Sequence, residues 1–370
     1  MIIKNALVYT DDFHFVPGDV CMDGEHFSQQ SNDSEVMDAA GLYAIPGLID
    51  VHLHGCVGYD FCDGTDEALD AMCAYEGKHG VTAINPASMT LSEETLSAIY
   101  ENAAKYTYRD GAMFVGINME GPFFNPAKKG AQNGAFLHAP DIDMFRRLQE
   151  KAKGLIRIAC IAPEVEGSMD FIREASKGTT VSIAHTAADY DTASEAFRNG
   201  ADHVTHLYNA MPPLSHRAPG VIGAAIDANA DAEIICDGVH IHPSAIRAAF
   251  RMFGDDHLML ISDSMMATGL DDGMYSLGGQ PVQVKGNHAT LKDGTLAGSV
   301  TNLFDCMKCA VSFGIPLESA IKMASWNPAR SIGLLDQMGS ITPGKLANLV
   351  LVDKDLNIKA VYVKGHALTL

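Results

Sequence analysis

Two histidines, His52 and His54, stand two positions apart at the end of the apolar run in "GLIDVHLHG". In a β-strand, side chains at positions i and i+2 point to the same face, so both imidazoles are expected to project together from one strand end. This is the geometry of a chelate. An isolated pair of this kind is more often two polar residues where a strand leaves the core, so the rest of the sequence must decide.

Further side chains of the metal-binding type follow other apolar runs. Histidines with carboxylates suit Zn²⁺ or a similar ion, and such sets hold one or two ions. A zinc-type ion lowers the pKa of its water to about 7 and polarises a carbonyl, so hydrolysis of an amide-like bond is the expected chemistry. Asp263, which follows "LMLI", is the candidate general base and later general acid. The other candidate groups are Glu120, His185, His206, Asp237 and His240.

Eight compact apolar runs carry these side chains, and helix-like segments follow most of them. Apolar strands that alternate with helices imply a parallel sheet covered on both sides, and eight such units imply a (β/α)₈ barrel. A doubly wound sheet is the main alternative. We predict an α/β fold with a TIM-like barrel, whose active site lies at the carboxyl ends of the strands. The runs begin at Gly47, Gly80, Met113, Leu155, Thr179, Ala201, Ala232 and Leu258.

Both ends of the chain have the alternating pattern of short strands separated by turns. We therefore expect a small β-sandwich domain formed by residues 1–46 and 340–370, and a barrel domain formed by residues 47–339. Residues 273–292 break the strand–helix rhythm with "KGN" and "KDG" turns nearby. This segment is predicted to be a β-hairpin insertion in the barrel.

Composition excludes several classes of protein. The chain has 370 residues, 47% of them hydrophobic, and a formal net charge of −20, which argues against nucleic acid or an anionic membrane as a partner. No apolar run approaches the roughly 20 residues of a membrane span. The eight cysteines are scattered and form no short disulfide-rich module, so we expect reduced thiols and a cytoplasmic protein.

The motifs "HLHG", "MEGPFF", "AHT", "HLYNAMPPLSHRAPG", "SDSMMATG", "LAGS" and "WNPAR" follow one another in this order. With them the chain resembles the amidohydrolase superfamily nearly end to end and, within it, the N-acetylglucosamine-6-phosphate deacetylases. The resemblance implies a barrel with a β-sandwich formed by both termini, usually as a homodimer. It also implies removal of acetate from N-acetylglucosamine 6-phosphate, which gives glucosamine 6-phosphate in amino sugar catabolism.

The resemblance also assigns roles to the candidate groups. Glu120, His185 and His206 would hold the principal metal ion, and Asp263 would be the acid and base. His52 and His54 match the pair found in members that bind a second ion, so one or two ions are expected. Zn²⁺ is the first expectation for the metal, with Fe, Mn, Co or Ni as alternatives.

The implied ligand is a phosphosugar. Arg217 and His240 would bind its phosphate, and a guanidinium suits phosphate well. Gln132 stands where the family usually has a histidine thought to touch the acetyl carbonyl; Gln can donate a hydrogen bond but cannot carry a proton, so we expect weaker stabilisation from that side. The remaining substrate contacts implied are Ala131, Asn209, Ala210, Leu296, Ala297 and Gly298.

Three alternatives remain beside this interpretation. The substrate could be a related amino sugar phosphate, such as N-acetylgalactosamine 6-phosphate. A cyclic amidase or deaminase is disfavoured, because such members often carry a modified lysine on the fourth strand, where this chain has "IACIAPE". A catalytically inactive scaffold is disfavoured because every metal position is filled.

Overall fold

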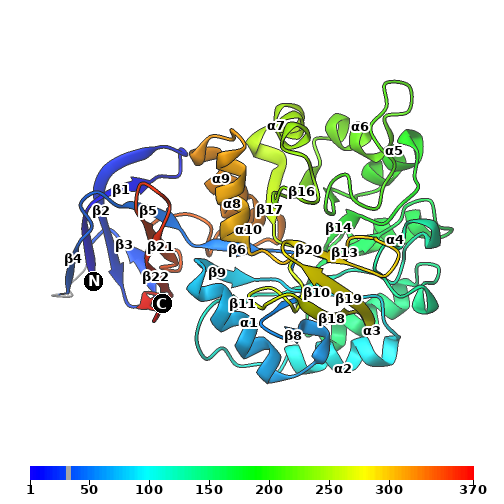
Figure 1. Cartoon of the computed structure of the whole chain (residues 1–370), viewed down its shortest axis with the longest axis horizontal. Helices are drawn as coiled ribbons and strands as arrows, with labels where there is room; N and C mark the ends of the chain where they lie inside the picture. The colour runs from blue at the N-terminus through cyan, green and yellow to red at the C-terminus, as the bar shows by residue number, and fades with distance from the viewer. Residues whose placement is uncertain (31–34) are drawn as a thin grey trace.

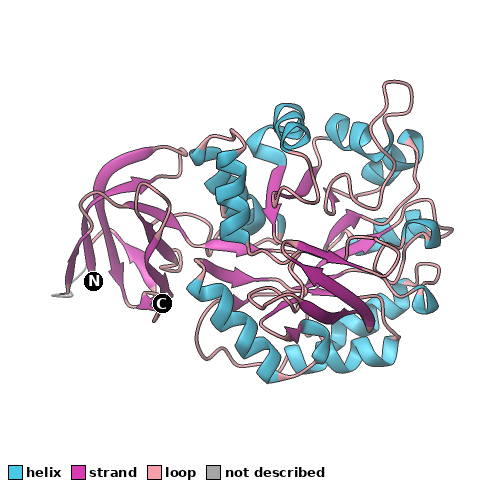
Figure 2. Ribbon diagram, viewed as in Figure 1, coloured by secondary structure: helices cyan, strands magenta, loops and turns pink. Residues whose placement is uncertain are grey.

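The computed structural model describes residues 1–30 and 35–370. A β-sheet region that contains both termini lies beside a larger region of strands and helices (Figure 1). Helices surround the strands of the larger region (Figure 2). Among the described residues, no helix is both long and apolar enough to cross a membrane.

The larger region contains two parallel sheets that together supply the strands of the barrel. Three strands form one sheet in the order β11-β9-β6, and seven form the other in the order β10-β12-β13-β14-β15-β16-β17. Every predicted apolar run contributes at least one of these strands. Their bounds are β6 Leu48–Asp50, β9 Val81–Ile84, β10 Ala87–Ser88, β11 Met113–Phe114, β12 Ile117–Met119, β13 Ile156–Ile161, β14 Thr180–Ile183, β15 His203–Val204, β16 Asp231–Ile235 and β17 Leu258–Ile261.

Backbone hydrogen bonds join the first strand to the last just beyond their carboxyl ends. The amide of Asp263 donates to the carbonyl of His52 at 2.9 Å, and the amide of His54 donates to the carbonyl of Ser264 at 2.7 Å. The ring therefore closes, as a barrel does and a doubly wound sheet does not. The predicted fold class is confirmed.

Helices connect successive strands, and many begin where a short polar side chain caps the first turn. The Thr65 hydroxyl accepts from the amide of Ala68 at 3.2 Å, and the Asp189 carboxylate accepts from the amide of Thr192 at 2.9 Å. The bounds are α1 Asp66–Lys78, α2 Glu93–Ala103, α3 Ile142–Lys151, α4 Ser168–Ala175, α5 Tyr190–Arg198, α6 Gly220–Ala228, α7 Pro243–His257, α8 Leu303–Ser312, α9 Leu317–Ala324 and α10 Trp326–Ser331.

Strands from both ends of the chain form one sheet in the order β23-β22-β21-β5-β1-β2-β3, with β4 paired to β1. The sheet curls, because β3 hydrogen-bonds to residues that precede β21: the amide of Phe27 donates to the carbonyl of Lys345 at 2.9 Å. The domain boundaries at 46/47 and 339/340 stay predictions. The strands are β1 Ile2–Tyr9, β2 Phe15–Asp23, β3 His26–Ser28, β4 Val36–Asp38, β5 Tyr43–Pro46, β21 Leu349–Val352, β22 Ile358–Val363 and β23 His366–Ala367.

The segment after β17 forms a small antiparallel sheet of three strands, β18 Gly273–Leu277, β19 Gln280–Lys285 and β20 His288–Thr290. The first two are a hairpin, and β20 adds a third strand to it. The side-chain amide of Gln280 donates to the carbonyl of Ala131, which follows the short helix η2 Pro126–Lys128. This contact ties the insertion to a loop at the carboxyl ends of the strands.

Candidate metal centre and active site

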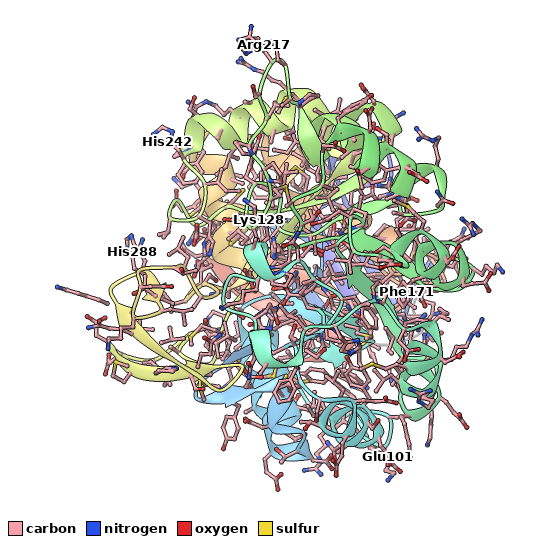
Figure 3. The ribbon with its side chains drawn as sticks, turned by 90° about the vertical axis from the view of Figure 1, so that its right-hand side faces the viewer. Glu101, Lys128, Phe171, Arg217, His242 and His288 are labelled. Carbon is pink, nitrogen blue, oxygen red and sulfur yellow. The ribbon has the colours of Figure 1, made fainter. Side chains whose placement is uncertain are left out.

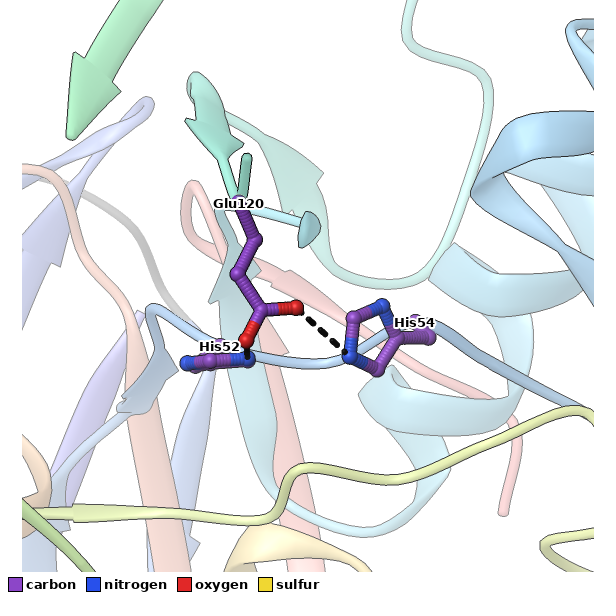
Figure 4. Close-up of side chains that lie close together, drawn as sticks. All are labelled: His52, His54 and Glu120. Atoms are coloured by element: carbon purple, nitrogen blue, oxygen red, sulfur yellow. Dashed lines mark ion pairs between the residues drawn. The ribbon is translucent and has the colours of Figure 1, made fainter. Parts of the chain in front are cut away.

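Glu120 lies at the centre of a buried cluster to which four strands of the barrel contribute. Its Oε1 is 3.1 Å from Nε2 of His185 and 3.3 Å from Nε2 of His206, and Oε2 is 3.4 Å from Nε2 of His54. His52 Nε2 lies 3.6 Å from Oε1 (Figure 4). We call these five side chains the metal cluster.

The half of the cluster formed by Glu120, His185 and His206 has the spacing of ligands around one small cation. The three ligand atoms are 3.1, 3.1 and 3.3 Å apart, the first of these values being the Nε2–Nε2 distance between the two histidines. Ligands held at roughly 2.0–2.1 Å in a tetrahedron would be about 3.3 Å apart. The residues therefore fit a zinc-type ion, and two imidazole nitrogens this close need a proton or a cation between them.

The other half, formed by His52, His54 and Glu120, is more open. Asp263 faces both of its histidines, with Oδ1 3.2 Å from Nε2 of His54 and 3.6 Å from Nε2 of His52. The Nε2 atom of His52 is fully buried and has no hydrogen-bond partner among the described residues. A buried nitrogen that points into a cluster of carboxylates is what a second ion would require.

Three of the four imidazoles are oriented through their other ring nitrogen. Nδ1 of His54 contacts the carbonyl of Ala87 at 3.2 Å, Nδ1 of His185 contacts the carbonyl of Lys128 at 2.9 Å, and Nδ1 of His52 contacts the carboxylate of Glu233 at 2.8 Å. Because each partner is an acceptor only, Nδ1 carries the proton and Nε2 presents its lone pair to the cluster.

The backbone at these strand ends is unusual for residues with side chains. His185, His206 and Asp263 have positive φ angles of 45°, 31° and 49°. Such left-handed conformations are uncommon outside glycine and concentrate at functional sites. Gly121, at φ 98°, follows Glu120, and a Cβ there would lie 2.1 Å from the hydroxyl of Thr90. The turn after Glu120 therefore requires glycine.

The charges of the cluster stabilise its carboxylates. Burial opposes ionisation of Glu120, but His52, His185 and His206 outweigh it and hold the pKa of this carboxyl well below its usual range. Burial likewise opposes ionisation of Asp263, but His54 and His52 lower its pKa below the ordinary value. Both groups are therefore carboxylates at neutral pH, ready to hold a cation or accept a proton.

A cavity of about 510 Å³ opens over the cluster. Residues from the insertion and the segment that follows it, such as Leu277 and Thr295, form part of its wall. His52 lies beneath the cavity, and Ala297 is buried beside lining residues. The predicted site residues that line it are His54, Glu120, Ala131, Gln132, His185, His206, Asn209, Ala210, His240, Asp263, Leu296 and Gly298.

Gln132 is already engaged on both sides of its amide. Its Nε2 donates to Oε2 of Glu120 at 2.7 Å, and its Oε1 accepts from the amide of Thr90 at 2.7 Å. One N–H of Gln132 is left for another partner. The side chain therefore orients Glu120, a contact that sequence reasoning did not anticipate.

The cations around the cavity differ from those predicted. His240 lines it, and its Nδ1 contacts the Asp237 carboxylate at 2.7 Å. Arg217 lies outside the cavity, exposed at the tip of a loop that projects from the molecule, whereas Lys128 lies near the centre of the same face (Figure 3). Lys128 and Lys129 line the cavity. The "KK" pair after "EGPFFNPA" was the signal that could have revealed them.

Comparison with known proteins agrees with this geometry. Residues 43–368 match the model of the amidohydrolase family. N-acetylglucosamine-6-phosphate deacetylase of Bacillus subtilis is 36% identical over 99% of this chain and 93% of its own length. N-acetylgalactosamine-6-phosphate deacetylase of Escherichia coli O157:H7 is 34% identical over 87% of this chain and 86% of its own.

Solved structures show the same relationship. The crystal structure of N-acetylglucosamine-6-phosphate deacetylase from Pasteurella multocida superposes with a TM-score of 0.93 at 31% identity, and the match covers 100% of this chain and 99% of that one. The chain belongs to the amidohydrolase family and, within it, to the N-acetylglucosamine-6-phosphate deacetylases.

Proposed function

We propose that the protein hydrolyses the N-acetyl group of N-acetylglucosamine 6-phosphate to acetate and glucosamine 6-phosphate. The observation that carries this proposal is the metal cluster with Asp263 beside it, at the floor of a cavity that also contains cationic side chains. A metal-binding floor suits amide hydrolysis, and cations suit a phosphorylated substrate. The full-length similarity to deacetylases of this substrate supports the choice among amidohydrolase reactions.

We assign the principal ion to Glu120, His185 and His206, and a second ion to His52 and His54 with Glu120 shared between them. A divalent ion supplies Lewis acidity, which activates water and polarises the acetyl carbonyl. Zn²⁺ is the proposed native ion because of the histidine-rich ligand set, with Fe, Mn, Co or Ni as alternatives. Metal analysis of the purified protein distinguishes them.

Asp263 is the proposed acid and base. Its lowered pKa keeps it ionised, and it faces the same side of the cluster as His54. It accepts a proton from the attacking water as the new C–O bond forms, and it returns that proton to the amide nitrogen as the C–N bond breaks. The acid proton left on the new carboxyl group then passes to the released amine, so the products are acetate and a protonated amine, and atoms and charge balance.

Gln132, Ala131 and the residues around them are proposed to hold the sugar and its acetyl group, together with Asn209, Ala210 and Leu296 to Gly298. Gln132 has one free N–H, which can donate to the acetyl carbonyl while the other orients Glu120. Because Gln carries no charge, it contributes to polarising the carbonyl only through this neutral hydrogen bond.

The phosphate is proposed to bind at the cationic side of the cavity. Asp237 raises the pKa of His240 above its ordinary value, against the opposing effect of burial, which favours a charged imidazole near neutral pH. Lys128 and Lys129 are additional candidates. The resemblance also assigns the phosphate to Arg217. Because this side chain projects away from the cavity, such a contact requires its loop to move toward the cavity or a second copy of the chain to supply it.

Acetate release from N-acetylglucosamine 6-phosphate by the metal-loaded protein tests the proposal. The epimer N-acetylgalactosamine 6-phosphate and the unphosphorylated sugar are assayed beside it, since a relative of similar identity is named for the epimer. A higher kcat/KM for the glucosamine compound supports the main proposal, and a higher kcat/KM for the epimer supports the alternative. Activity on a cyclic amide without any acetate release would contradict both.

A homodimer and a cytoplasmic location are the remaining proposals. The exposed Arg217 loop and the family resemblance support the first, and scattered free cysteines support the second. Analytical ultracentrifugation and cell fractionation test them separately.

A further inference from the structure

A carboxylate, Glu233, lies buried in a barrel strand, on the face opposite to that of its apolar chain neighbours. It stands in the middle of β16, is fully buried, and has the apolar residues Ala232 and Ile234 as chain neighbours. Burying a charged group is costly unless specific partners compensate for it. Its contacts therefore need an account.

Glu233 lies between two imidazoles. Its Oε2 accepts from Nδ1 of His52 at 2.8 Å and from the backbone amide of His206 at 3.0 Å. Its Oε1 lies 3.3 Å from Nε2 of His203, a fully buried residue of β15, in ion-pair contact. His203 is held in turn by the hydroxyl of Ser331, 3.1 Å from its Nδ1. A chain of polar contacts thus runs from the metal cluster through β16 and β15 to Ser331 at the end of α10.

The hydrogen-bond partner of His52 Nδ1 differs in charge from the partners of the other two oriented histidines. His54 and His185 are held by neutral backbone carbonyls, whereas His52 is held by a charged carboxylate. A carboxylate behind a histidine ligand fixes the tautomer and makes the imidazole a stronger donor. The open half of the cluster, where the ligand atoms are farther apart, is the half that receives this support.

We infer that Glu233, backed by His203, is a positioning residue for His52 and determines whether the His52 and His54 half of the cluster binds an ion. The inference rests on the metal dependence in the proposed function. It assigns a role to two residues that contact neither the cavity nor the substrate.

A purely structural role for Glu233 is the competing explanation. An apolar side chain of similar volume would fill this position without the cost of burying a charge. In addition, Oε1 has no aligned hydrogen bond among the described residues. A packing role alone would not require the hydrogen bond to Nδ1 of His52, whereas orienting that ligand does.

Zn²⁺ titration of the full-length, metal-depleted protein tests the inference. The wild type is expected to bind two ions, and Glu233→Gln is expected to weaken the second about 10–100-fold and leave the first unchanged. Glu76→Gln is the control: the Glu76 carboxyl group, on α1, is as deeply buried, and its oxygens have no hydrogen-bond partner among the described residues. Both ions should bind this control as they bind the wild type.

A double-mutant cycle with His52→Gln separates positioning from structure. If Glu233 acts through His52, adding Glu233→Gln to His52→Gln causes no further loss of Zn²⁺ affinity. Equal weakening of both ions, an additive loss in the double variant, or a wild type that binds one ion would overturn the inference. Because the readout is Zn²⁺ binding, failure of the deacetylase assay would leave this result intact, and the reverse holds as well.

Discussion

The two halves of the metal cluster share Glu120 but are built in different ways. In the half with His185 and His206, the ligand atoms lie 3.1–3.3 Å apart, and both histidines have left-handed backbone angles. In the half with His52 and His54, the distances to Glu120 are 3.6 and 3.4 Å, and a carboxylate supports one ligand from behind.

The difference indicates how each half is made ready for an ion. The first is shaped by the backbone itself, because the strand ends fix where the side chains begin. In the second, His54 is held by a backbone carbonyl but His52 is held by another side chain, and such a contact is easier to lose by one substitution. We therefore expect the first half to bind its ion more tightly than the second.

Removing the shared ligand should have the largest effect, because it breaks both halves. Glu120→Gln keeps the shape of the side chain but removes its charge, and we expect both ions to be lost. The loss of kcat/KM should exceed about 10⁴-fold, the upper end for loss of an acid–base group. Metal content and acetate release measure this, with Glu76→Gln as the control. Retention of two ions would contradict the central role of Glu120.

Removing one unshared ligand from each half tests the comparison directly. His185→Gln should lose the principal ion and nearly all activity. His54→Gln should keep one ion and measurable activity, while its second-ion affinity falls by more than the roughly 10–100-fold typical of residues behind a ligand. Zn²⁺ per chain and acetate release are measured for both variants. The same losses in both would show that the halves do not differ.

Asp263 should affect chemistry without affecting either half. Asp263→Asn removes the proton acceptor, so kcat is expected to fall about 10²–10⁴-fold while both ions remain bound. Steady-state kinetics and metal analysis provide the two readouts. Asp293→Asn, which removes another carboxylate from the cavity wall, is the control and should have little effect on kcat. Loss of an ion in Asp263→Asn would make Asp263 a ligand instead.

The smallest effect is expected at the phosphate end, outside both halves. Asp237 raises the pKa of His240, so the imidazole stays charged to a higher pH and loses its charge as the pH rises through that raised value. KM for the phosphosugar should therefore rise with pH over that range. His240→Gln should raise KM about tenfold or more and remove this pH dependence, since a hydrogen bond to a charged group contributes about 1.5–3 kcal/mol.

Asp237→Asn refines the same prediction. Without the carboxylate at 2.7 Å, the pKa of His240 should fall, so the rise in KM should begin at a lower pH. An unchanged KM profile in both variants would place the phosphate elsewhere, with Lys128 and Lys129 as the next candidates.

The sequence predicted the barrel because each strand is a nearly continuous apolar run, a pattern that requires only the side chains themselves. Ligands at strand ends, such as His185 and His206, were predictable for the same reason: barrel topology brings those ends together. The order of the motifs along the chain supported the resemblance to the family. The catalytic and binding roles of these residues stay predictions.

Side-chain contacts that depend on the path of a loop, or on residues far apart in the sequence, could not be predicted from the sequence. Glu233 and His203 lie within the apolar runs "AEIICDG" and "ADHVTH", where a polar residue gives no indication of its partner. The direction of Arg217 depends on a tight turn between Ser215 and Ala218, which no local pattern fixes relative to the cavity. The double contact of Gln132 depends on Thr90, far away in the chain.

The backbone hydrogen bonds between His52 and Asp263 and between His54 and Ser264 close the barrel at the same place where the active site lies. A nascent chain cannot form these hydrogen bonds until its last barrel strand has been synthesised, so an incomplete chain has no complete active site. A cation bound by residues from strands far apart in the sequence would stabilise the closed barrel. Removal of the metal by a chelator should therefore make the folded barrel more susceptible to proteolysis.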